Sequence, residues 1–514
     1  MAFIAVSIPV NAPEDIGVAL AHAAASVEAG ADLVEWRIDE WPSLEASAAA
    51  VAQLVDDGPA PCILTVRSVA EGGGFEGSAD ELATFLQAVA VSGACPRYVD
   101  IEHAMWSGSE AIRAAFDELH DDVGLILSMH DMLGRPDDLL RRAVDMQAEE
   151  SADVVKIVWR ARSTRDNLEA FELLRTRAKP MIALCMGELG LPSRVLAGRA
   201  GGFLTFASSE AGETAEGQCD VTTLVQRYRF GSLQPDTMVY GIIGWPITHS
   251  LSPVVHNEGF RAADIDAVLL PLPVLQGWES FKATMSVLLA DPEFNLRGLC
   301  VTVPHKEHAL RFVREAGGEV SDIAERVGAA NTIIIGPDGA LTADNTDAPA
   351  IIETLGCDPS GSRIALLGAG GAARAAIASL VEAGARVDVF NRGAERATAL
   401  VEAMDNPMCT LGDLDEVSGY DVVMNTTSVG MEGGPDPDGN AAEELGLPDW
   451  VVEEAGVVYE CVYAPRQTPL VQAALAAGTS VVTGEAMFLA QAVRQFRMWT
   501  GCEPSSDRWR QLID

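Results

Sequence analysis

The chain has few basic residues and very few lysines. Its 514 residues include 35 lysines and arginines against 75 aspartates and glutamates, which gives a formal net charge of −40. Nucleic acids and anionic membranes are bound by clustered positive charge, so this balance argues against either as a partner. The only lysines are Lys156, Lys179, Lys282 and Lys306. Because lysine is so rare here, each one is a candidate for a specific role.

Other common signals are also missing. The nine cysteines include no CxxC pair, so we expect free thiols, no disulfide framework and no bound metal. No apolar run reaches membrane-spanning length and the first residues show no leader pattern, so we expect a soluble cytoplasmic protein without a membrane partner. A hydrophobic fraction of 48% is that of a globular protein, and 514 residues exceed what one core usually serves. The chain should therefore form two or more domains.

Residues 1–230 show a repeating alternation of β-rich runs and helix-like stretches. About eight such units within roughly 230 residues are typical of a (β/α)8 TIM barrel. Polar side chains gather late in the runs or in the loops that follow, which is the end of a barrel where catalytic sites are built. The β-rich runs are residues 3–10, 32–39, 62–67, 98–102, 124–130, 154–160, 181–186 and 202–208.

Lys156 lies in the sixth run, where strand alternation points its side chain into the barrel. Burial disfavours the ammonium form and nearby arginines would disfavour it further, so we expect a lowered pKa and an amine able to condense with a ketone. The alternative is a structural lysine that reaches solvent at the strand end. His130 ends the preceding run and is suited to moving protons at the same mouth. Arg67 and Glu71 offer a cation for the substrate and an anion to orient the imidazole.

These residues resemble the type I 3-dehydroquinate dehydratases over the whole of residues 1–230. The resemblance implies that Lys156 forms an imine, that His130 is the general acid and base, and that Glu71 pairs with His130. It also implies that the hydroxyls and carboxylate of the substrate are bound by Glu35, Arg37, Arg67, Arg194 and Gln218. One departure is Glu216, where the family usually has proline, so the mobility of the Gln218 loop could differ. The matching segments are Glu35-Trp-Arg-Ile-Asp, residues 67–71 with Gly-Gly following, Ser128-Met-His-Asp, Ala152-Asp-Val-Val-Lys-Ile, Met186-Gly, Ser193-Arg and Ala215-Glu-Gly-Gln.

A second part of the chain begins where the barrel pattern breaks, after Gly231. A strand-like run starts at residue 239, and another starts at residue 363, enters the turn Gly368-Ala-Gly-Gly-Ala-Ala and continues as a helix. This order fits the dinucleotide fingerprint, whose glycines let the backbone approach a pyrophosphate at a helix N-terminus. The next run ends in Asn391-Arg392, with Arg396 one turn later. An arginine where the adenosine ribose is read suits a 2′-phosphate, so we expect NADP rather than NAD.

Candidate substrate residues precede the fingerprint. Ser250 and Ser252 lie just before a predicted helix, where paired hydroxyls make a carboxylate clamp; simple helix capping is the alternative. Lys306 and Asp347 supply an amine and a carboxylate, which together give a proton donor for a ketone that becomes an alcohol. Asn331 lies between them in the sequence. A surface ion pair is the alternative for Lys306.

The second part resembles shikimate dehydrogenase from about residue 239 to the C-terminus. Further matching segments are Asn425-Thr-Thr-Ser-Val-Gly-Met, Tyr463-Ala-Pro-Arg-Gln-Thr-Pro-Leu and Gly484-Glu-Ala-Met-Phe-Leu-Ala-Gln-Ala. The resemblance implies catalysis by Lys306 and Asp347, and substrate contacts from Ser250, Ser252, Thr302, Asn331, Tyr463 and Gln491. It implies an NADP site made by Gly368, Ala369, Gly370, Gly371, Ala372, Asn391, Arg392, Arg396, Thr426 and Gly484. Departures are Cys300, Ala348, Gly393, Glu460 and Ala464, none of which removes a named catalytic group.

The sequence thus predicts an α/β chain in three parts: a TIM barrel over 1–230, a substrate-binding domain over 239–346 completed by 485–514, and a Rossmann NADP-binding domain over 347–484. The expected activity is conversion of 3-dehydroquinate to 3-dehydroshikimate and then, with NADPH, to shikimate, and these small molecules are the expected partners. One alternative is a second half that prefers quinate. Another is a non-catalytic regulator that senses the same metabolites. The oligomeric state is left open.

Overall fold

The computed structural model describes residues 2–41, 44, 48–210, 212–415, 417 and 419–513. The chain divides into two compact units, residues 1–237 and 238–514. Within the described ranges, no helix has the length and the apolar content needed to span a membrane.

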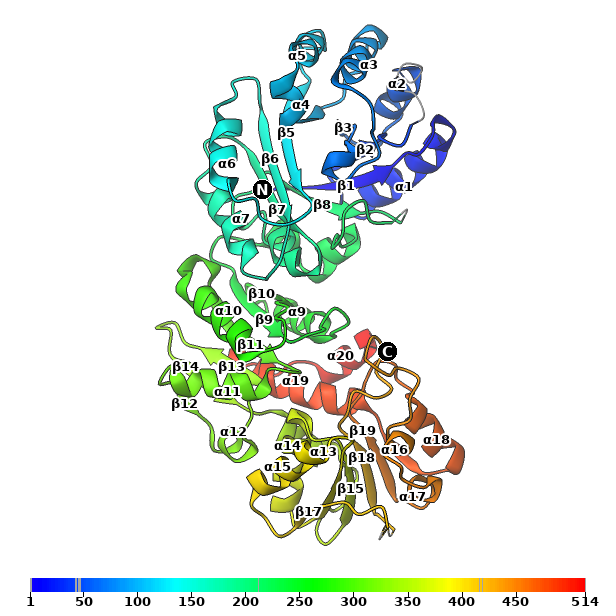
Figure 1. The fold of residues 1–514 in the computed structure, drawn as a ribbon, viewed down its shortest axis with the longest axis vertical. Helices are drawn as coiled ribbons and strands as arrows, with labels where there is room; N and C mark the ends of the chain where they lie inside the picture. Colours follow the sequence, from blue (N-terminus) through cyan, green and yellow to red (C-terminus); the bar gives the residue numbers. More distant parts are fainter. Residues whose placement is uncertain are drawn as a thin grey trace. The chain divides into compact units, whose positions relative to one another are not determined.

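The first unit is a nearly closed barrel of eight parallel strands with helices outside it (Figure 1). The strands are hydrogen-bonded in the order β7-β6-β5-β4-β3-β2-β1-β8. The N–H of Phe203, just before β8, donates to the carbonyl of Met181 in β7 at 2.8 Å and so links the two ends of the sheet. The predicted TIM-barrel fold is confirmed. The strands are β1 (Phe3–Pro9), β2 (Leu33–Arg37), β3 (Cys62–Thr65), β4 (Tyr98–Glu102), β5 (Gly124–Asp131), β6 (Val154–Arg160), β7 (Met181–Met186) and β8 (Leu204–Ser208).

The barrel strands place their last residues at a common mouth. Strands β3, β7 and β8 are buried at every position, because the lumen covers one face and the helices cover the other. Since all strands are parallel, Arg37, Glu102 and His130 reach the same end of the barrel. The helices are α1 (Ile16–Glu28), α2 (Ala48–Asp56), α3 (Ala79–Ser92), α4 (His103–Gly108), α5 (Glu110–Asp117), α6 (Leu139–Ala148), α7 (Asp166–Arg175) and α8 (Leu191–Val195).

The second unit begins with a six-stranded mixed sheet in the order β10-β9-β11-β13-β14-β12. Strand β9 pairs in parallel with β10 and β11, so the loop after β9 and the loop after β11 leave the sheet at the same edge. The elements are β9 (Met238–Ile243), α9 (Ser252–Ala262), β10 (Ala267–Pro271), α10 (Trp278–Ala290), β11 (Leu296–Val301), α11 (Lys306–Glu315), β12 (Glu319–Val320), α12 (Asp322–Val327), β13 (Thr332–Ile335) and β14 (Leu341–Asp344).

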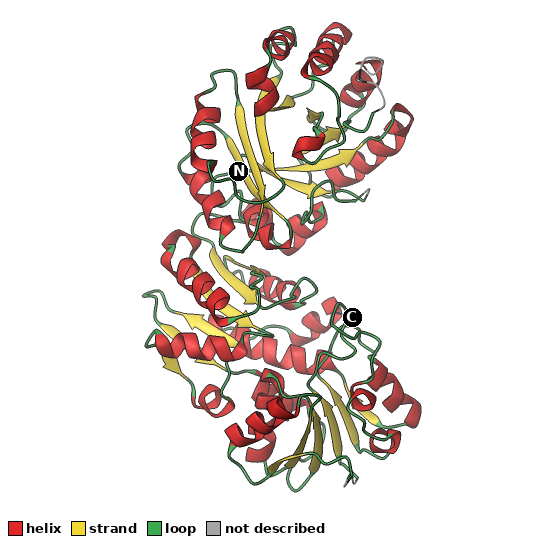
Figure 2. Cartoon of the chain, in the orientation of Figure 1, coloured by secondary structure: helices red, strands yellow, loops and turns green. Residues whose placement is uncertain are grey.

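A second, parallel sheet of the same unit has the strand order β17-β16-β15-β18-β19-β20, which is that of a doubly wound dinucleotide-binding fold. Helices α13–α15 lie on one face and α16–α18 on the other (Figures 1 and 2). Strand alternation explains this, because Ile364 and Leu366 enter one core whereas Ala365 and Leu367 enter the other. The elements are α13 (Asp347–Thr354), β15 (Arg363–Leu367), α14 (Gly371–Glu382), β16 (Arg386–Phe390), α15 (Ala394–Met404), β17 (Cys409–Leu411), β18 (Val422–Asn425), α16 (Ala441–Glu444), α17 (Asp449–Glu453), β19 (Val457–Glu460), α18 (Pro469–Ala477) and β20 (Ser480–Val482).

The last two helices return to the mixed sheet. These are α19 (Gly484–Thr500) and α20 (Ser506–Ile513). Phe496 of α19 packs against Phe260 of α9, with ring centroids 5.4 Å apart, and against Trp509 of α20 at 5.6 Å. Helix α19 also contacts β11 and β13, and this packing brings its polar face to the ends of those strands.

Candidate active sites

Lys156 is buried on β6 among acidic side chains. It is 4% exposed, its Nζ donates to Asp100 Oδ2 at 2.9 Å, and Glu35 Oε1 lies 3.5 Å away. The Phe206 ring covers the amine at 4.2 Å from Nζ to the ring centroid. Arginines were expected around this amine from the sequence, but two carboxylates are in contact with it. The nearby guanidinium of Arg67 is held on the other oxygen of Asp100, at 2.7 Å.

Arg67 is the centre of a buried ionic network at the barrel mouth. Its guanidinium donates to Asp100, to Ser128 Oγ at 2.9 Å and to Glu102 at 3.3 Å. Burial works against its charge, but the surrounding carboxylates raise the pKa of Arg67 above its ordinary value. Burial also tends to raise the pKa of Asp100, yet the charges of Arg67 and Lys156 hold that pKa well below its usual range. Both groups are therefore charged at neutral pH.

His130 and Glu71 form a hydrogen-bonded pair at the same mouth. Glu71 Oε2 accepts the backbone N–H of His130 at 2.9 Å and lies 2.9 Å from His130 Nδ1. Burial, followed by the charges of Arg67 and Lys156, lowers the pKa of His130 well below its ordinary value. Burial raises the pKa of Glu71 to about 8. The predicted pairing of Glu71 with the imidazole is thus present in the geometry.

Two of the predicted substrate residues of the barrel are held in place by neighbouring side chains. Glu35 accepts from Ser7 Oγ at 2.5 Å and from Thr65 Oγ1 at 3.0 Å, so both of its oxygens are held. Arg37 is bound by both oxygens of Asp39, at 2.7 and 3.0 Å. These contacts fix the two side chains at the barrel mouth without a ligand.

Arg194 on α8 is 2% exposed, and burial lowers its pKa. Its Nε has no hydrogen-bond partner among the described residues, while one terminal nitrogen lies 3.5 Å from the carbonyl of Glu216. The Gln218 carboxamide oxygen accepts the backbone N–H groups of Thr214 and Ala215 at 3.0 and 3.3 Å, which folds the loop on itself. The Glu216 carboxylate pairs with Arg160. The structure therefore brings the Gln218 loop next to a buried cation with donor capacity to spare.

The sequence analysis did not single out Asp100 or Ser128. Asp100 lies two residues before Glu102 on β4, so strand alternation sends both side chains to the same face. Ser128 is the register partner of Lys156 across β5 and β6. Alternation within the run 98–102 was the signal that could have identified Asp100.

Lys306 and Asp347 meet in the second unit. Lys306 Nζ donates to Asp347 Oδ2 at 2.7 Å, and the Asn331 amide donates to Asp347 Oδ1 at 2.8 Å. The Asn331 oxygen in turn accepts the Thr346 backbone N–H at 2.8 Å. Lys306 is the first residue of α11, at the positive end of the helix dipole, and the carboxylate opposite it compensates for that placement. Both oxygens of Asp347 are thus fixed.

The other predicted substrate residues of this unit lie on α9 and α19 and in the loops that follow β9, β11 and β19. Ser252 begins α9, and its backbone N–H donates to Ser250 Oγ at 3.2 Å. Burial raises the pKa of Tyr463, whose side chain is hydrogen-bonded to Ser250. Gln491 Oε1 lies 3.4 Å from Thr346 Oγ1. Thr302 leaves β11 beside the end of β9, with its backbone N–H bound to the carbonyl of Ile243 at 2.8 Å.

The glycine turn between β15 and α14 has the features of a phosphate cradle. Gly368 has a φ of +115°, and a Cβ there would lie 2.8 Å from Thr426 Oγ1. Gly370 is extended, and a Cβ there would meet nothing within 4 Å. Ala369 is partly buried against the core beneath the turn. The open space over Gly370, at the start of a helix, fits a pyrophosphate.

The other predicted cofactor residues lie at the carboxyl ends of neighbouring strands. After β16, Asn391 donates to the carbonyl of Gly393 at 2.9 Å, and Arg392 and Arg396 are exposed. Thr426 follows β18, and its hydroxyl donates to the carbonyl of Leu367 at 2.7 Å. Arg392 and Arg396 therefore lie after the carboxyl end of β16, where they would bind the 2′-phosphate of the adenosine ribose.

Packing also constrains two other residues that the sequence predicts at the cofactor site. Ala372 lies in the first turn of α14 and is partly buried. At Gly484 a Cβ would lie 2.2 Å from the carbonyl oxygen of Val462. Glycine is therefore required at residue 484 by a close backbone approach at the start of α19, whatever ligand binds nearby.

Two buried polar residues behind these sites were not predicted as functional. Gln495 donates to the carbonyl of Asn331 at 3.1 Å and to Thr332 Oγ1 at 3.0 Å, and it accepts from Cys300 at 3.2 Å. Burial raises the pKa of Glu460 to about 7. Gln495 lies one helical turn after Gln491 on α19, and this i, i+4 spacing was the available signal.

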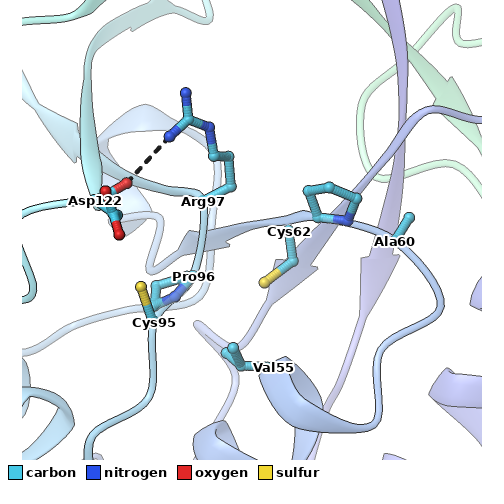
Figure 3. A pocket seen from close by; sticks show the side chains of 8 residues that line it. Val55, Ala60, Cys62, Cys95, Pro96, Arg97 and Asp122 are labelled. Atoms are coloured by element: carbon cyan, nitrogen blue, oxygen red, sulfur yellow. Dashed lines mark hydrogen bonds between the residues drawn. The ribbon is translucent and has the colours of Figure 1, made fainter.

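A hollow of about 250 Å³ lies at the opposite end of the barrel (Figure 3). Most of its lining residues lie at or just before the starts of β3, β4 and β5, including Cys62, Cys95 and Arg97. Arg97 donates to the carbonyl of Asp122 at 3.2 Å. None of the predicted site residues lines this hollow, and the ionic network of Lys156 lies at the carboxyl ends of the strands.

Family models and relatives agree on the two halves of the chain. The model for type I 3-dehydroquinase matches residues 4–234, and three models match the second half: shikimate dehydrogenase substrate binding domain (242–333), shikimate/quinate 5-dehydrogenase (352–431) and shikimate 5′-dehydrogenase C-terminal domain (484–512).

A bifunctional 3-dehydroquinate dehydratase/shikimate dehydrogenase of Arabidopsis thaliana, described as chloroplastic, is 34% identical over 508 residues, which are 95% of this chain and 80% of that protein. A shikimate dehydrogenase (NADP(+)) of Citrifermentans bemidjiense is 40% identical over 283 residues, 52% of this chain and 91% of that one. The solved dehydroquinate dehydratase and shikimate dehydrogenase of S. pombe is 25% identical, covers 100% of this chain and 98% of its own, and has a TM-score of 0.43. The chain belongs to the family of bifunctional 3-dehydroquinate dehydratase/shikimate dehydrogenases.

Proposed function

We propose that the barrel dehydrates 3-dehydroquinate to 3-dehydroshikimate and that the second unit reduces this product to shikimate with NADPH. The observation that carries the proposal is that each unit holds a lysine in contact with a carboxylate, the buried Lys156 with Asp100 and the half-buried Lys306 with Asp347. The two reactions are consecutive, because the ene-ketone released by the first is the ketone reduced by the second. A cytoplasmic location stays a prediction of the sequence.

In the barrel, the Lys156 amine attacks the ketone and expels its oxygen as water, which leaves an iminium. His130 removes a proton from the neighbouring carbon, and the same imidazole then protonates the departing hydroxyl, so that one water is lost. Glu71 supports this proton exchange through its bond to Nδ1. Hydrolysis of the iminium releases the product and restores the amine. The carboxylate at Lys156 serves as an anchor for the positive charge of the iminium.

The substrate carboxylate binds Arg194, the buried cation on α8 between β7 and β8. Among the described residues the Nε of Arg194 has no hydrogen-bond partner, and burial lowers the pKa of this group. A substrate carboxylate would accept that hydrogen bond and stabilise the buried charge. The Gln218 loop folds over the same place, with Gln218 itself 7% exposed. Glu35 and Arg37 then face the substrate hydroxyls from the opposite side of the mouth.

In the second unit, Lys306 donates the proton that the ketone oxygen needs when it becomes an alcohol. Asp347 accepts a hydrogen bond from the amine and so orients it, and Asn331 holds Asp347 in place. Ser250, Ser252 and Tyr463 provide hydroxyl donors for the substrate carboxylate. NADPH, when bound, supplies the hydride to the carbonyl carbon. The turn at Gly370 and the cations after β16 would hold it.

The test is a coupled assay on the full chain with 3-dehydroquinate and NADPH as the only reagents. We expect NADPH to be consumed and shikimate to appear. Lys156→Ala should abolish this, and adding 3-dehydroshikimate should restore it. A protein that uses neither substrate is a regulator, and one that oxidises quinate faster than shikimate has the other specificity; either result contradicts the proposal.

A further inference from the structure

Two consecutive glycines of the turn between β15 and α14 differ in what fills the place of their missing side chains. A Cβ on Gly370 would meet nothing within 4 Å. A Cβ on Gly371 would lie 3.0 Å from Cδ and 3.2 Å from Cβ of Lys306, well inside ordinary van der Waals contact. The space at Gly370 is thus open to a ligand, whereas the space at Gly371 is occupied by the protein itself.

The backbone does not explain the glycine at position 371. Gly371 is the first residue of α14 and is not among the residues with positive φ, so alanine could adopt the same conformation. Glycine is also the less favourable of the two residues in a helix. The stem of Lys306 is therefore the structural reason for the missing side chain.

The contact belongs to a wider approach between two helix starts. Lys306 begins α11 and Gly371 begins α14. Glu307, the residue after Lys306, forms an ion pair with Arg374, one turn along α14. The distance from Glu307 Oε2 to Arg374 Nη2 is 3.5 Å. The N-termini of the two helices therefore face each other, with the lysine stem between them.

We infer that Gly371 is a positioning residue for Lys306: its missing side chain leaves the room in which the lysine stem runs to Asp347. This inference rests on the proposed role of Lys306 as proton donor. It moves Gly371 out of the NADP site that the family resemblance implied: Gly370 leaves room for the cofactor, and Gly371 leaves room for the Lys306 side chain. The turn predicted to bind NADP thereby also sets the distance between Lys306 Nζ and Asp347.

The first test compares Gly371→Ala with Gly370→Ala in the full chain. The added methyl at residue 371 must displace the lysine stem, so kcat for reduction should fall about tenfold while the Kd for NADPH stays within about twofold. At residue 370 the methyl enters the cofactor space, so the main effect should be a higher Kd for NADPH. Dehydratase activity checks that the barrel of each variant is folded, and a cooperative thermal transition checks the second unit.

The second test is a double-mutant cycle on thermal stability, which needs no activity. Gly371→Ala should lower the melting temperature of the second unit, and the loss should be smaller when Lys306 is already alanine, because Cγ and Cδ are then absent. An equal loss in both backgrounds would overturn the inference, as would a Gly371→Ala variant that raises the Kd for NADPH and leaves kcat unchanged. Failure of the proposed function is separate: it would appear as full reduction by Lys306→Ala.

Discussion

Replacing Glu71 by glutamine tests how His130 exchanges protons. Glu71 Oε2 is hydrogen-bonded both to the backbone N–H of His130 and to its Nδ1. The side-chain oxygen of a glutamine at this position can accept both hydrogen bonds. The pKa of Glu71 is raised to about 8 and that of His130 is lowered, so below pH 8 the pair holds one more proton than it does above. Only above that value does Nε2 of a neutral imidazole become free to act as the base. Dehydration should therefore accelerate as the pH rises through about 8.

The size of the effect follows from this pKa. About nine tenths of the pairs are in the base form at pH 9 and about one tenth at pH 7, so kcat/KM of the native protein should fall roughly tenfold between them. Glutamine cannot titrate, so the Glu71→Gln profile should be flat over this range. At pH 9 the variant should be slower by about 10- to 100-fold, because no anion stabilises the imidazolium. At pH 7 the ratio of native to variant kcat/KM should be about tenfold smaller than at pH 9, because only the native rate falls.

The assay is kcat/KM for 3-dehydroquinate from pH 6 to 9.5. Glu76→Gln is the matched control, because it removes the same charge from an exposed position on the same loop. The reasoning is refuted if Glu71→Gln keeps a rising limb near pH 8, or if the control loses it.

Three further results are expected. Lys306→Ala should abolish reduction while dehydration persists, and loss of both activities would show that the units depend on each other. Arg392→Ser should raise KM for NADP by tenfold or more and KM for NAD by much less, since only NADP carries the 2′-phosphate; equal changes would contradict that role. Glu460→Gln tests stability. Burial raises the pKa of Glu460 to about 7 from 4.5, so the folded chain keeps a proton that the unfolded chain loses, and stability falls as the pH rises through this window. The variant should therefore have the native melting temperature at pH 5 and a higher one at pH 8. The corresponding difference in the free energy of unfolding at pH 8 is roughly 3 kcal/mol. Equal melting temperatures at pH 8 would show that Glu460 is not destabilising when ionised.

Much of the fold could be predicted because the strands have strong local patterns. In the barrel, runs such as 98–102, 154–160 and 181–186 coincide with β4, β6 and β7, since both faces of a barrel strand are buried and its residues are mostly apolar. The mixed sheet of the second unit is different. The antiparallel pairing of β13 with β11 and β14 depends on contacts between distant segments, which local patterns do not record.

The candidate sites were predicted where function needs an unusual residue. Lys156 and Lys306 are conspicuous because lysine is rare, and His130 ends a strand. Asp100 was missed because its only local signal was strand alternation with Glu102, and its contacts with Arg67 and Lys156 join separate segments of the chain. The electrostatic surroundings of Lys156 were misjudged for the same reason.

The central claim is that the buried amine of Lys156 is the nucleophile of the barrel. It is tested most directly by borohydride reduction of the protein with 3-dehydroquinate, followed by mass mapping of the peptides. Because the chain has only four lysines, each can be scored separately. The account predicts one adduct, on the peptide that contains Lys156. An adduct on Lys179, Lys282 or Lys306 instead, or no adduct in protein that still dehydrates the substrate, would contradict it.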